Sequence, residues 1–231
     1  MAALSLSLLA VWVTSTAVGN RAAPTSDRFK SGSGFFISRD GDLVTSAHVV
    51  TGCPSISVWG SDGRQRAGSV LATDDALDIA LLRAPGSTTD YARASELIEP
   101  SIGTAVFVLG YGVIVSDPRR PVAANGTYLG SDMALNGVRV LAIHARLQRG
   151  QSGGPVVDAD GGLLGMVMGR VTETPSRGVV LPAGDIQAFL SFQGKHLSIG
   201  QADARGAPSK LLPAITVLVQ CLPLGTGDGV R

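Results

Sequence analysis

Short apolar runs recur along the chain from Ser31 onward, and glycine, aspartate or proline separates each run from the next. The runs have strand length and are rich in β-branched residues, as in SISVW at 55–59 and IALLRA at 79–84. The separators carry turn chemistry, as in DADGG at 158–162. Many short strands joined by regular turns predict an all-β barrel or sandwich.

Helical patterns are sparse. SAHVV at 46–50 predicts a single helical turn. PAGDIQAFLSF, which ends at residue 192, places Ile186, Phe189 and Leu190 on one face behind an aspartate that caps or charges the helix start. We therefore expect one helix near the end of the strand-rich region.

Three further segments differ in composition from the strand-rich runs. Residues 113–137 are rich in proline, glycine, asparagine and aspartate, and they predict a long surface loop. Residues 199–212 predict a linker, and AITVLVQC at 214–221 predicts one more strand.

The first residues of the chain are apolar. Residues 1–19 carry no charge, Leu4 to Val13 form a run of signal-peptide length, and STA at 15–17 offers a small-residue cleavage site. We expect residues 1–23 to be a signal peptide or an N-terminal anchor; a misplaced start or a buried segment is the third interpretation. The protein is then exported, to the periplasm or beyond, and meets a membrane only if this segment stays uncleaved.

Composition narrows the functional classes. The chain has 231 residues, of which 45% are hydrophobic and 16% charged, and its net charge is +1. This is typical of a packed globular protein, and without a basic surplus we expect no nucleic-acid partner. Two cysteines, Cys53 and Cys221, are enough for one bridge.

The GQSGGP stretch at 150–155 places Ser152 among glycines. A serine hydroxyl needs a base to become a nucleophile, and the tetrahedral intermediate needs hydrogen-bond donors at its oxyanion. Gly150 allows a sharp turn that presents its own N–H group together with that of Ser152. A plain glycine turn in a hairpin is the alternative interpretation of this motif.

The candidate base is His48, at the end of the apolar LVTSAHVV run, where a packed histidine is the simpler interpretation. The candidate acid is Asp78, which leads directly into DIALL and must find donors if it is buried. Asp74 and Asp75 compete with it for this role. His48, Asp78 and Ser152 together, in this order, predict a catalytic triad.

Three motifs resemble those of the trypsin-like serine peptidases: GSGFFIS followed by LVTSAHVV, DIALL, and GQSGGPVVDADGGLLGMV. Within that family the chain is similar to bacterial HtrA/Deg-type and related exported peptidases, over about residues 31–192. The resemblance implies an all-β fold of two Greek-key six-stranded β-barrels, at about 31–100 and 101–182, with the active site in the cleft between them. A short C-terminal helix at 184–192 follows, and residues 193–231 form a linker and an added terminal strand.

The resemblance also assigns roles. It makes His48 the general base, Asp78 its orienting acid and Ser152 the nucleophile, with an oxyanion hole formed by the N–H groups of Gly150 and Ser152. The implied reaction is hydrolysis of a polypeptide substrate through an acyl-enzyme. The implied substrate-binding residues are Leu147, Arg149, Met168 and Gly169.

The chain departs from the family pattern in three places. Gln151 precedes the nucleophile, where digestive members carry aspartate and HtrA-like members usually carry asparagine. Without a carboxylate there, a freed N-terminus has no buried partner, so we expect no activation by N-terminal cleavage. Arg149 is unusual beside the specificity pocket, and we expect no PDZ domain after residue 192.

The two cysteines match a further family pattern. Some exported trypsin-like peptidases resemble this chain in carrying one cysteine a few residues past the histidine and another in a terminal strand. The resemblance therefore implies a Cys53–Cys221 disulfide that holds the terminal strand against the N-terminal barrel.

Two other functions stay open. A peptidase fold can serve as a catalytically silent binding module, and GQSGG also satisfies the G-x-S-x-G motif of α/β-hydrolase esterases. The esterase needs a helix after the serine, whereas GPVV favours a strand. No Cys/His cluster has metal-ligand spacing, so we expect neither a metal nor another cofactor.

Overall fold

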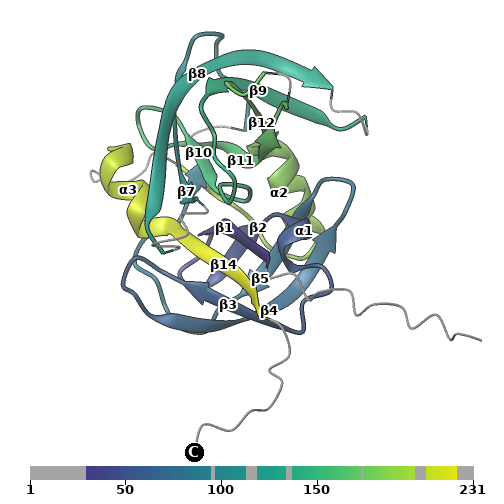
Figure 1. Ribbon diagram of the computed structural model, residues 1–231, viewed down its shortest axis with the longest axis vertical. Helices are drawn as coiled ribbons and strands as arrows, with labels where there is room; N and C mark the ends of the chain where they lie inside the picture. The colour runs from purple at the N-terminus through teal and green to yellow at the C-terminus, as the bar shows by residue number, and fades with distance from the viewer. Residues whose placement is uncertain are drawn as a thin grey trace, which may run out of the picture.

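The computed structural model describes residues 30–94, 97–112, 119–133, 137–172, 174–200 and 207–222. Two closed antiparallel β-barrels make up most of this part of the chain (Figure 1). The expected segment at residues 1–23 lies outside the described residues.

The first barrel has the strand order β1-β14-β3-β4-β5-β2. Its strands are β1 (Lys30–Phe36), β2 (Asp42–Thr45), β3 (Ser55–Trp59), β4 (Gln65–Asp74), β5 (Ile79–Arg83) and β14 (Thr216–Leu222). Figure 1 shows β14, in yellow, crossing the lower barrel beside strands from the start of the chain. It pairs with β1 on one side, where Cys221 lies opposite Lys30, and with β3 on the other.

The second barrel has the strand order β10-β11-β12-β9-β8-β7 and is built from one continuous stretch of sequence. Its strands are β7 (Ala105–Tyr111), β8 (Pro121–Met133), β9 (Arg139–Ala145), β10 (Pro155–Val157), β11 (Leu163–Arg170) and β12 (Arg177–Pro182).

Short elements complete the structure. They are α1 (Ala47–Val50), α2 (Ala183–Phe192), α3 (Pro208–Ile215) and a parallel pair of two-residue strands, β6 (Arg93–Ala94) and β13 (Ser198–Ile199). No helix among the described residues is long and apolar enough to cross a membrane.

Each barrel has its own apolar interior, and a third cluster of buried side chains lies between them. Helix α2 contributes Ile186, Phe189 and Leu190 to this shared cluster, and α3 contributes Leu212 and Ile215. Burying such side chains supplies roughly 1.5–3 kcal/mol each before the entropy cost of folding. The helices therefore fix the relative position of the barrels, and with it the cleft expected between them.

The predicted fold class is confirmed, and the two barrels exclude the α/β-hydrolase alternative, because Ser152 leads into strand β10 rather than a helix. The helical turn at α1 and the helix α2 also match their sequence patterns.

Three expectations need correction. The loop expected at 113–137 contains a long strand, β8, and the linker expected at 199–212 contains the start of α3. The terminal strand expected as an addition held against the first barrel is one of the six strands of that barrel, because the chain returns to it after completing the second.

Candidate active site

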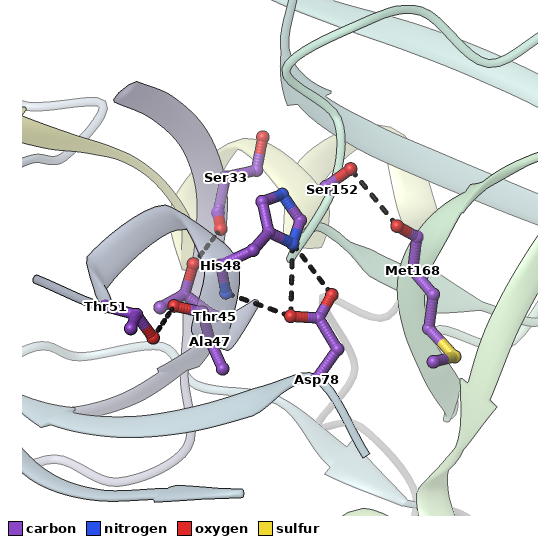
Figure 2. A network of polar contacts seen from close by, with 8 residues as sticks. All are labelled: Ser33, Thr45, Ala47, His48, Thr51, Asp78, Ser152 and Met168. Carbon is purple, nitrogen blue, oxygen red and sulfur yellow. Dashed lines mark hydrogen bonds and ion pairs between the residues drawn. The ribbon is translucent and has the colours of Figure 1, made fainter. Parts of the chain in front are cut away.

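His48 and Asp78 meet at the edge of the first barrel (Figure 2). His48 lies in the α1 turn directly after β2, and Asp78 directly precedes β5. The imidazole Nδ1 lies 2.8 Å from Oδ2 of Asp78 and 3.1 Å from its Oδ1. Since β2 and β5 pair along their length, the register of the sheet brings the two side chains together.

The backbone reinforces this pair. The N–H of His48 donates to Oδ1 of Asp78 at 2.9 Å, and the N–H of Ala47 donates to the Asp78 carbonyl at 3.2 Å. A carboxylate that accepts from Nδ1–H leaves the lone pair on Nε2, which is the nitrogen that a general base needs. The imidazole itself is 57% exposed, so substrate can reach this nitrogen.

Asp78 has an unusual backbone conformation. Its φ is +51°, and among the described residues no other non-glycine residue has a positive φ. Aspartate tolerates this region better than most residues, and such strain persists where surrounding contacts enforce it. Of the competing acids, Asp74 instead accepts the N–H of Leu77 within its own turn, at 3.0 Å.

Ser152 lies in the turn before β10 of the second barrel. A Cβ atom placed on the adjacent Gly153 would lie 2.9 Å from the backbone nitrogen of Ser46, so this turn packs directly against the start of α1. The Ser152 hydroxyl donates to the Met168 carbonyl at 3.3 Å, and no hydrogen bond joins it to His48 within this described site (Figure 2).

The backbone around Ser152 is held tightly. The N–H of Gly153 donates to the Val167 carbonyl at 2.8 Å, and the N–H of Gly154 donates to the Gln151 carbonyl at 2.9 Å. Gly150 has φ +91°, and a Cβ atom there would lie 2.3 Å from the Tyr111 carbonyl oxygen. Only glycine fits this position, because any side chain meets both steric strain and backbone atoms.

Two donors of the turn stay available. Within the described part of the chain, neither the N–H of Gly150 nor that of Ser152 donates to a protein acceptor. Two available N–H groups, one on the candidate nucleophile and one two residues before it, have the chemistry of an anion site.

Gln151 is fully buried, and its side chain bridges two parts of the second barrel. Its Oε1 accepts the N–H of Gln148 at 2.7 Å, and its Nε2 donates to the Val122 carbonyl at 2.8 Å. This neutral side chain satisfies its own polar atoms without a charged partner. The sequence identified the missing carboxylate, but not the bridge to Val122.

The four residues expected to bind substrate occupy different environments. Met168 lies beside the nucleophile, and Gly169 faces open space, since nothing lies within 4 Å of a Cβ placed there. Leu147 is buried in the interior of the second barrel, against Gly178, whereas Arg149 is exposed. Of these four residues, Met168, Gly169 and Arg149 thus lie near the nucleophile or at the surface, whereas Leu147 belongs to the core of the second barrel.

The backbone of Tyr111 lies against the Gly150 turn, and its phenol is a buried titratable group. Its burial, and to a smaller extent the negative charge of Asp62, raise the pKa of its phenol above the ordinary value. The phenol is therefore neutral and does not compete with His48 as a base. No group of three or more His, Cys, Asp or Glu side chains suited to a metal occurs in the described ranges.

A disulfide joins Cys53 to Cys221, with their Cα atoms 5.5 Å apart. Cys53 follows α1, and its N–H donates to the Val50 carbonyl at 3.1 Å. The bridge therefore connects β14 to the segment that carries His48.

Comparison with known proteins identifies relatives of this arrangement. Residues 32–166 match the family model for the trypsin-like peptidase domain. The chain is 35% identical over 184 residues to an uncharacterized protein, y4bJ, of Sinorhizobium fredii, covering 77% of this chain and 28% of that protein. It is 31% identical over 188 residues to the serine protease Rv3671c of Mycobacterium tuberculosis, covering 77% of this chain and 46% of that protein. The chain thus spans less than half the length of these two relatives.

Solved structures agree with the sequence relatives. The active form of the Rv3671c protease from M. tuberculosis superposes with a TM-score of 0.64 at 28% identity, covering 77% of this chain and 80% of that one. A serine endoprotease from Yersinia pestis superposes with a TM-score of 0.59 at 21% identity, over 70% of this chain and 56% of that one, and so shares the fold.

Proposed function

We propose that this chain, which belongs to the trypsin-like peptidase family, is a serine endopeptidase that cleaves polypeptides through an acyl-enzyme. The observation that carries the proposal is the His48–Asp78 pair, with Nδ1 2.8 Å from the carboxylate, beside a tightly held serine turn. The family membership supports the reaction class, and the geometry supports the roles proposed for His48, Asp78 and Ser152.

The first half of the reaction forms the acyl-enzyme. The Ser152 hydroxyl leaves the Met168 carbonyl, turns to His48 and gives its proton to Nε2 as Oγ attacks the substrate carbonyl carbon. The oxyanion accepts hydrogen bonds from the N–H groups of Gly150 and Ser152. Asp78 stabilises the imidazolium that His48 becomes. The C–N bond then breaks as His48 gives its proton to the leaving amine.

The second half releases the product. Water loses a proton to Nε2 of His48 as its oxygen attacks the acyl carbon, and collapse of the new intermediate returns the proton to Ser152. The hydrogen bond from Ser152 to Met168 is a resting contact. At 3.3 Å to a neutral carbonyl it is long for an O–H···O bond, so a bound substrate replaces it at small cost.

Substrate preference follows from the residues near the turn. Leu147 and Met168 are apolar, Gly169 leaves room for the substrate backbone, and Arg149 lies exposed at the rim. We propose that the side chain before the cleaved bond is apolar. A cleavage profile on a peptide library tests this, and a dominant preference for a charged residue there would contradict it.

The active turn needs no new N-terminus, since Gln151 is already satisfied by Gln148 and Val122. Shortened chains that start at Ala22 and at Ser26 are then expected to be equally active. Residues 1–23 serve for export or anchoring, and the disulfide suits an oxidising compartment.

Covalent labelling tests the proposed function. A fluorophosphonate probe labels the wild type at Ser152, and the wild type hydrolyses casein; Ser152→Ala does neither while keeping the fold, because the hydroxyl performs chemistry rather than packing. A folded wild type that resists the probe and leaves casein intact would instead identify a silent binding module, in which the Ser152–Met168 contact is permanent.

A further inference from the structure

Ser33, in the GSGFF segment of β1, is a buried polar residue at the junction of the two barrels. It is 0% exposed, and its hydroxyl makes two hydrogen bonds. Oγ donates to the Gly150 carbonyl at 2.7 Å and accepts the N–H of Tyr111 at 2.8 Å. Both contacts reach from the first barrel into the second.

The backbone of Ser33 continues this connection. Its N–H donates to the Ser152 carbonyl at 2.8 Å. Its own carbonyl accepts a hydrogen bond from the Thr45 hydroxyl at 2.6 Å, as Figure 2 shows. Thr45 ends β2, two residues before the α1 helix that carries His48. Ser33 is thus hydrogen-bonded both to the nucleophile turn and to the strand that leads to the base.

These contacts fix the peptide planes that form the turn. Ser33 donates hydrogen bonds to the carbonyls of Gly150 and Ser152, from its hydroxyl and its N–H group respectively. The N–H of Gly154 donates to the carbonyl of Gln151, which lies between them in the chain. Three consecutive peptide groups therefore have fixed orientations. The N–H of Ser152 belongs to the middle one, and the N–H of Gly150 is on the residue whose carbonyl Ser33 holds.

We propose that Ser33 is a positioning residue for the reaction: its hydroxyl keeps the Gly150–Ser152 turn in the shape that directs the two N–H groups at the oxyanion. This inference rests on the proposed peptidase function. The hydroxyl is required because an apolar side chain would leave the buried Gly150 carbonyl and Tyr111 N–H without this partner.

The expected kinetic signature is specific. Oxyanion donors act on charge that develops only in the transition state, so their misplacement lowers kcat more than it raises KM. Loss of one such donor costs about 10²–10³ in kcat, and an indirect positioning effect is smaller, on the order of 10–100-fold. The pH profile of kcat/KM stays in place, because His48 and Asp78 are untouched.

Ser57 offers a matched control. It is a buried serine of the same barrel, in β3, 1% exposed, and its hydroxyl has no hydrogen-bond partner. Ser57→Ala removes the same atom from a buried position of the same barrel, breaks no hydrogen bond and does not touch the turn. A general effect of removing a buried hydroxyl would appear in both variants.

The experiment compares Ser33→Ala and Ser57→Ala with the wild type in kcat, KM, pH profile and affinity for a peptide aldehyde that forms a tetrahedral adduct. We expect Ser33→Ala to lose 10–100-fold in kcat and similarly in aldehyde affinity, with KM within about threefold. Ser57→Ala stays within twofold of the wild type.

Several outcomes overturn the inference. They are a kcat of Ser33→Ala within twofold of the wild type, a loss confined to KM, a shifted pH profile, or an equal loss in Ser57→Ala. If Ser33→Ala shows no cooperative unfolding, Ser33→Cys, which keeps the size but is a weaker donor, is judged by the same criteria with a smaller expected loss. A wild type that reacts with neither probe nor peptide overturns the proposed function, and this inference with it.

Discussion

The two barrels have the same strand arrangement but are assembled differently along the chain. If β14, β1, β2, β3, β4 and β5 are matched in that order with β7 to β12, the order of neighbours around both closed barrels is identical. The second barrel is continuous in sequence, whereas the first takes its leading strand from residues beyond the second. The first barrel is therefore a circular permutation of the second.

The difference coincides with the placement of the disulfide and the candidate base. His48 and Asp78 belong to the first barrel, and the Cys53–Cys221 bridge ties the distant strand to it. The second barrel carries the Ser152 turn and has neither of the two cysteines of the chain. The barrel whose closure joins residues far apart in sequence, and so costs more loop entropy, is the one that is cross-linked.

The largest effect is expected from removing the distant strand. A chain that ends at Gly200 lacks β14, whose Val217, Leu218 and Val219 are fully buried, and exposes the edges of β1 and β3. We expect it to lose cooperative unfolding and to aggregate. Circular dichroism melts and gel filtration measure this, and fluorophosphonate labelling at the wild-type rate would show that the first barrel forms without β14.

The next effect concerns orientation of the base. Asp78→Asn should reduce kcat about 10⁴-fold near neutral pH, because an asparagine in a Ser-His-Asp triad holds the histidine in the wrong tautomer. Asp74→Asn is the control, since Asp74 only holds the N–H of Leu77, and it should stay within about threefold. An inactive Asp74→Asn variant together with an active Asp78→Asn variant would assign the orienting role to Asp74 instead of Asp78.

Removing the disulfide gives a smaller effect, on stability. In the chain-entropy description, a bridge across 168 residues contributes up to about 5 kcal/mol to the free energy of unfolding. Replacing both cysteines by alanine should lower the urea midpoint, and the reduced wild type should unfold near the same midpoint. A loss below about 1 kcal/mol would mean that packing alone holds β14.

A circular permutant sharpens the same comparison. Cys221 lies opposite Lys30, so a short turn from Leu222 to Lys30 converts β14 and β1 into a hairpin, with new ends before Pro208 and after Gly200. We expect a folded, active protein. Its disulfide would close a loop of about 30 residues, which lowers the entropic contribution of the bridge by about 1.5 kcal/mol. Chemical unfolding of the permutant with and without the bridge measures this difference.

The smallest effect concerns the stability of the protein at acidic pH. Burial acts to raise the pKa of Asp42, but hydrogen bonds from Arg83 and Lys195 outweigh it and hold this pKa below the ordinary value of 3.8. A lowered folded pKa gives stability that is present above the unfolded pKa and is lost as pH falls through the folded one. Asp42→Asn should therefore weaken the dependence of the free energy of unfolding on pH below about pH 4.

The second barrel provides the control for this titration. Asp132 pairs with Arg177 at 2.7 Å, but both side chains are substantially exposed. Exposed pairs contribute only about 0–1 kcal/mol, so Asp132→Asn should leave the acid profile almost unchanged. Equal flattening by both substitutions would mean that burial of Asp42 gives it no special role.

Local pattern predicted most elements well. The runs at β3 and β5 match their apolar stretches closely, because one or both faces are buried. The pattern at β8 was misleading, since its proline, glycine, asparagine and aspartate residues favour turns. Gly126 lies in mid-strand, where a Cβ atom would come within 1.9 Å of the His144 carbonyl oxygen. Tertiary packing of β9 selects glycine there, and sequence pattern alone does not show this.

The candidate site likewise combines residues that local sequence motifs predicted with residues that they did not. The motifs identified His48, Asp78 and Ser152 because such chemistry has a recognisable local context. Ser33 and the bridging role of Gln151 depend on contacts with Gly150 and Val122, which lie far away in the chain. The terminal strand was expected against the first barrel through the Cys53–Cys221 bridge, but not as one of the six barrel strands, because a strand's own residues do not specify its partners.

Closure of the first barrel by β14 also sets an order of events during synthesis. Because a chain emerges from its N-terminal end, at the ribosome or across a membrane, the barrel with Ser152 has all its strands once residue 182 is out, but the barrel with His48 and Asp78 must wait for residue 222. The pair of His48 and Asp78 thus gains its complete barrel only after the barrel of Ser152 has all its strands. The two halves of the candidate site therefore come together only when nearly all of the described protein has emerged.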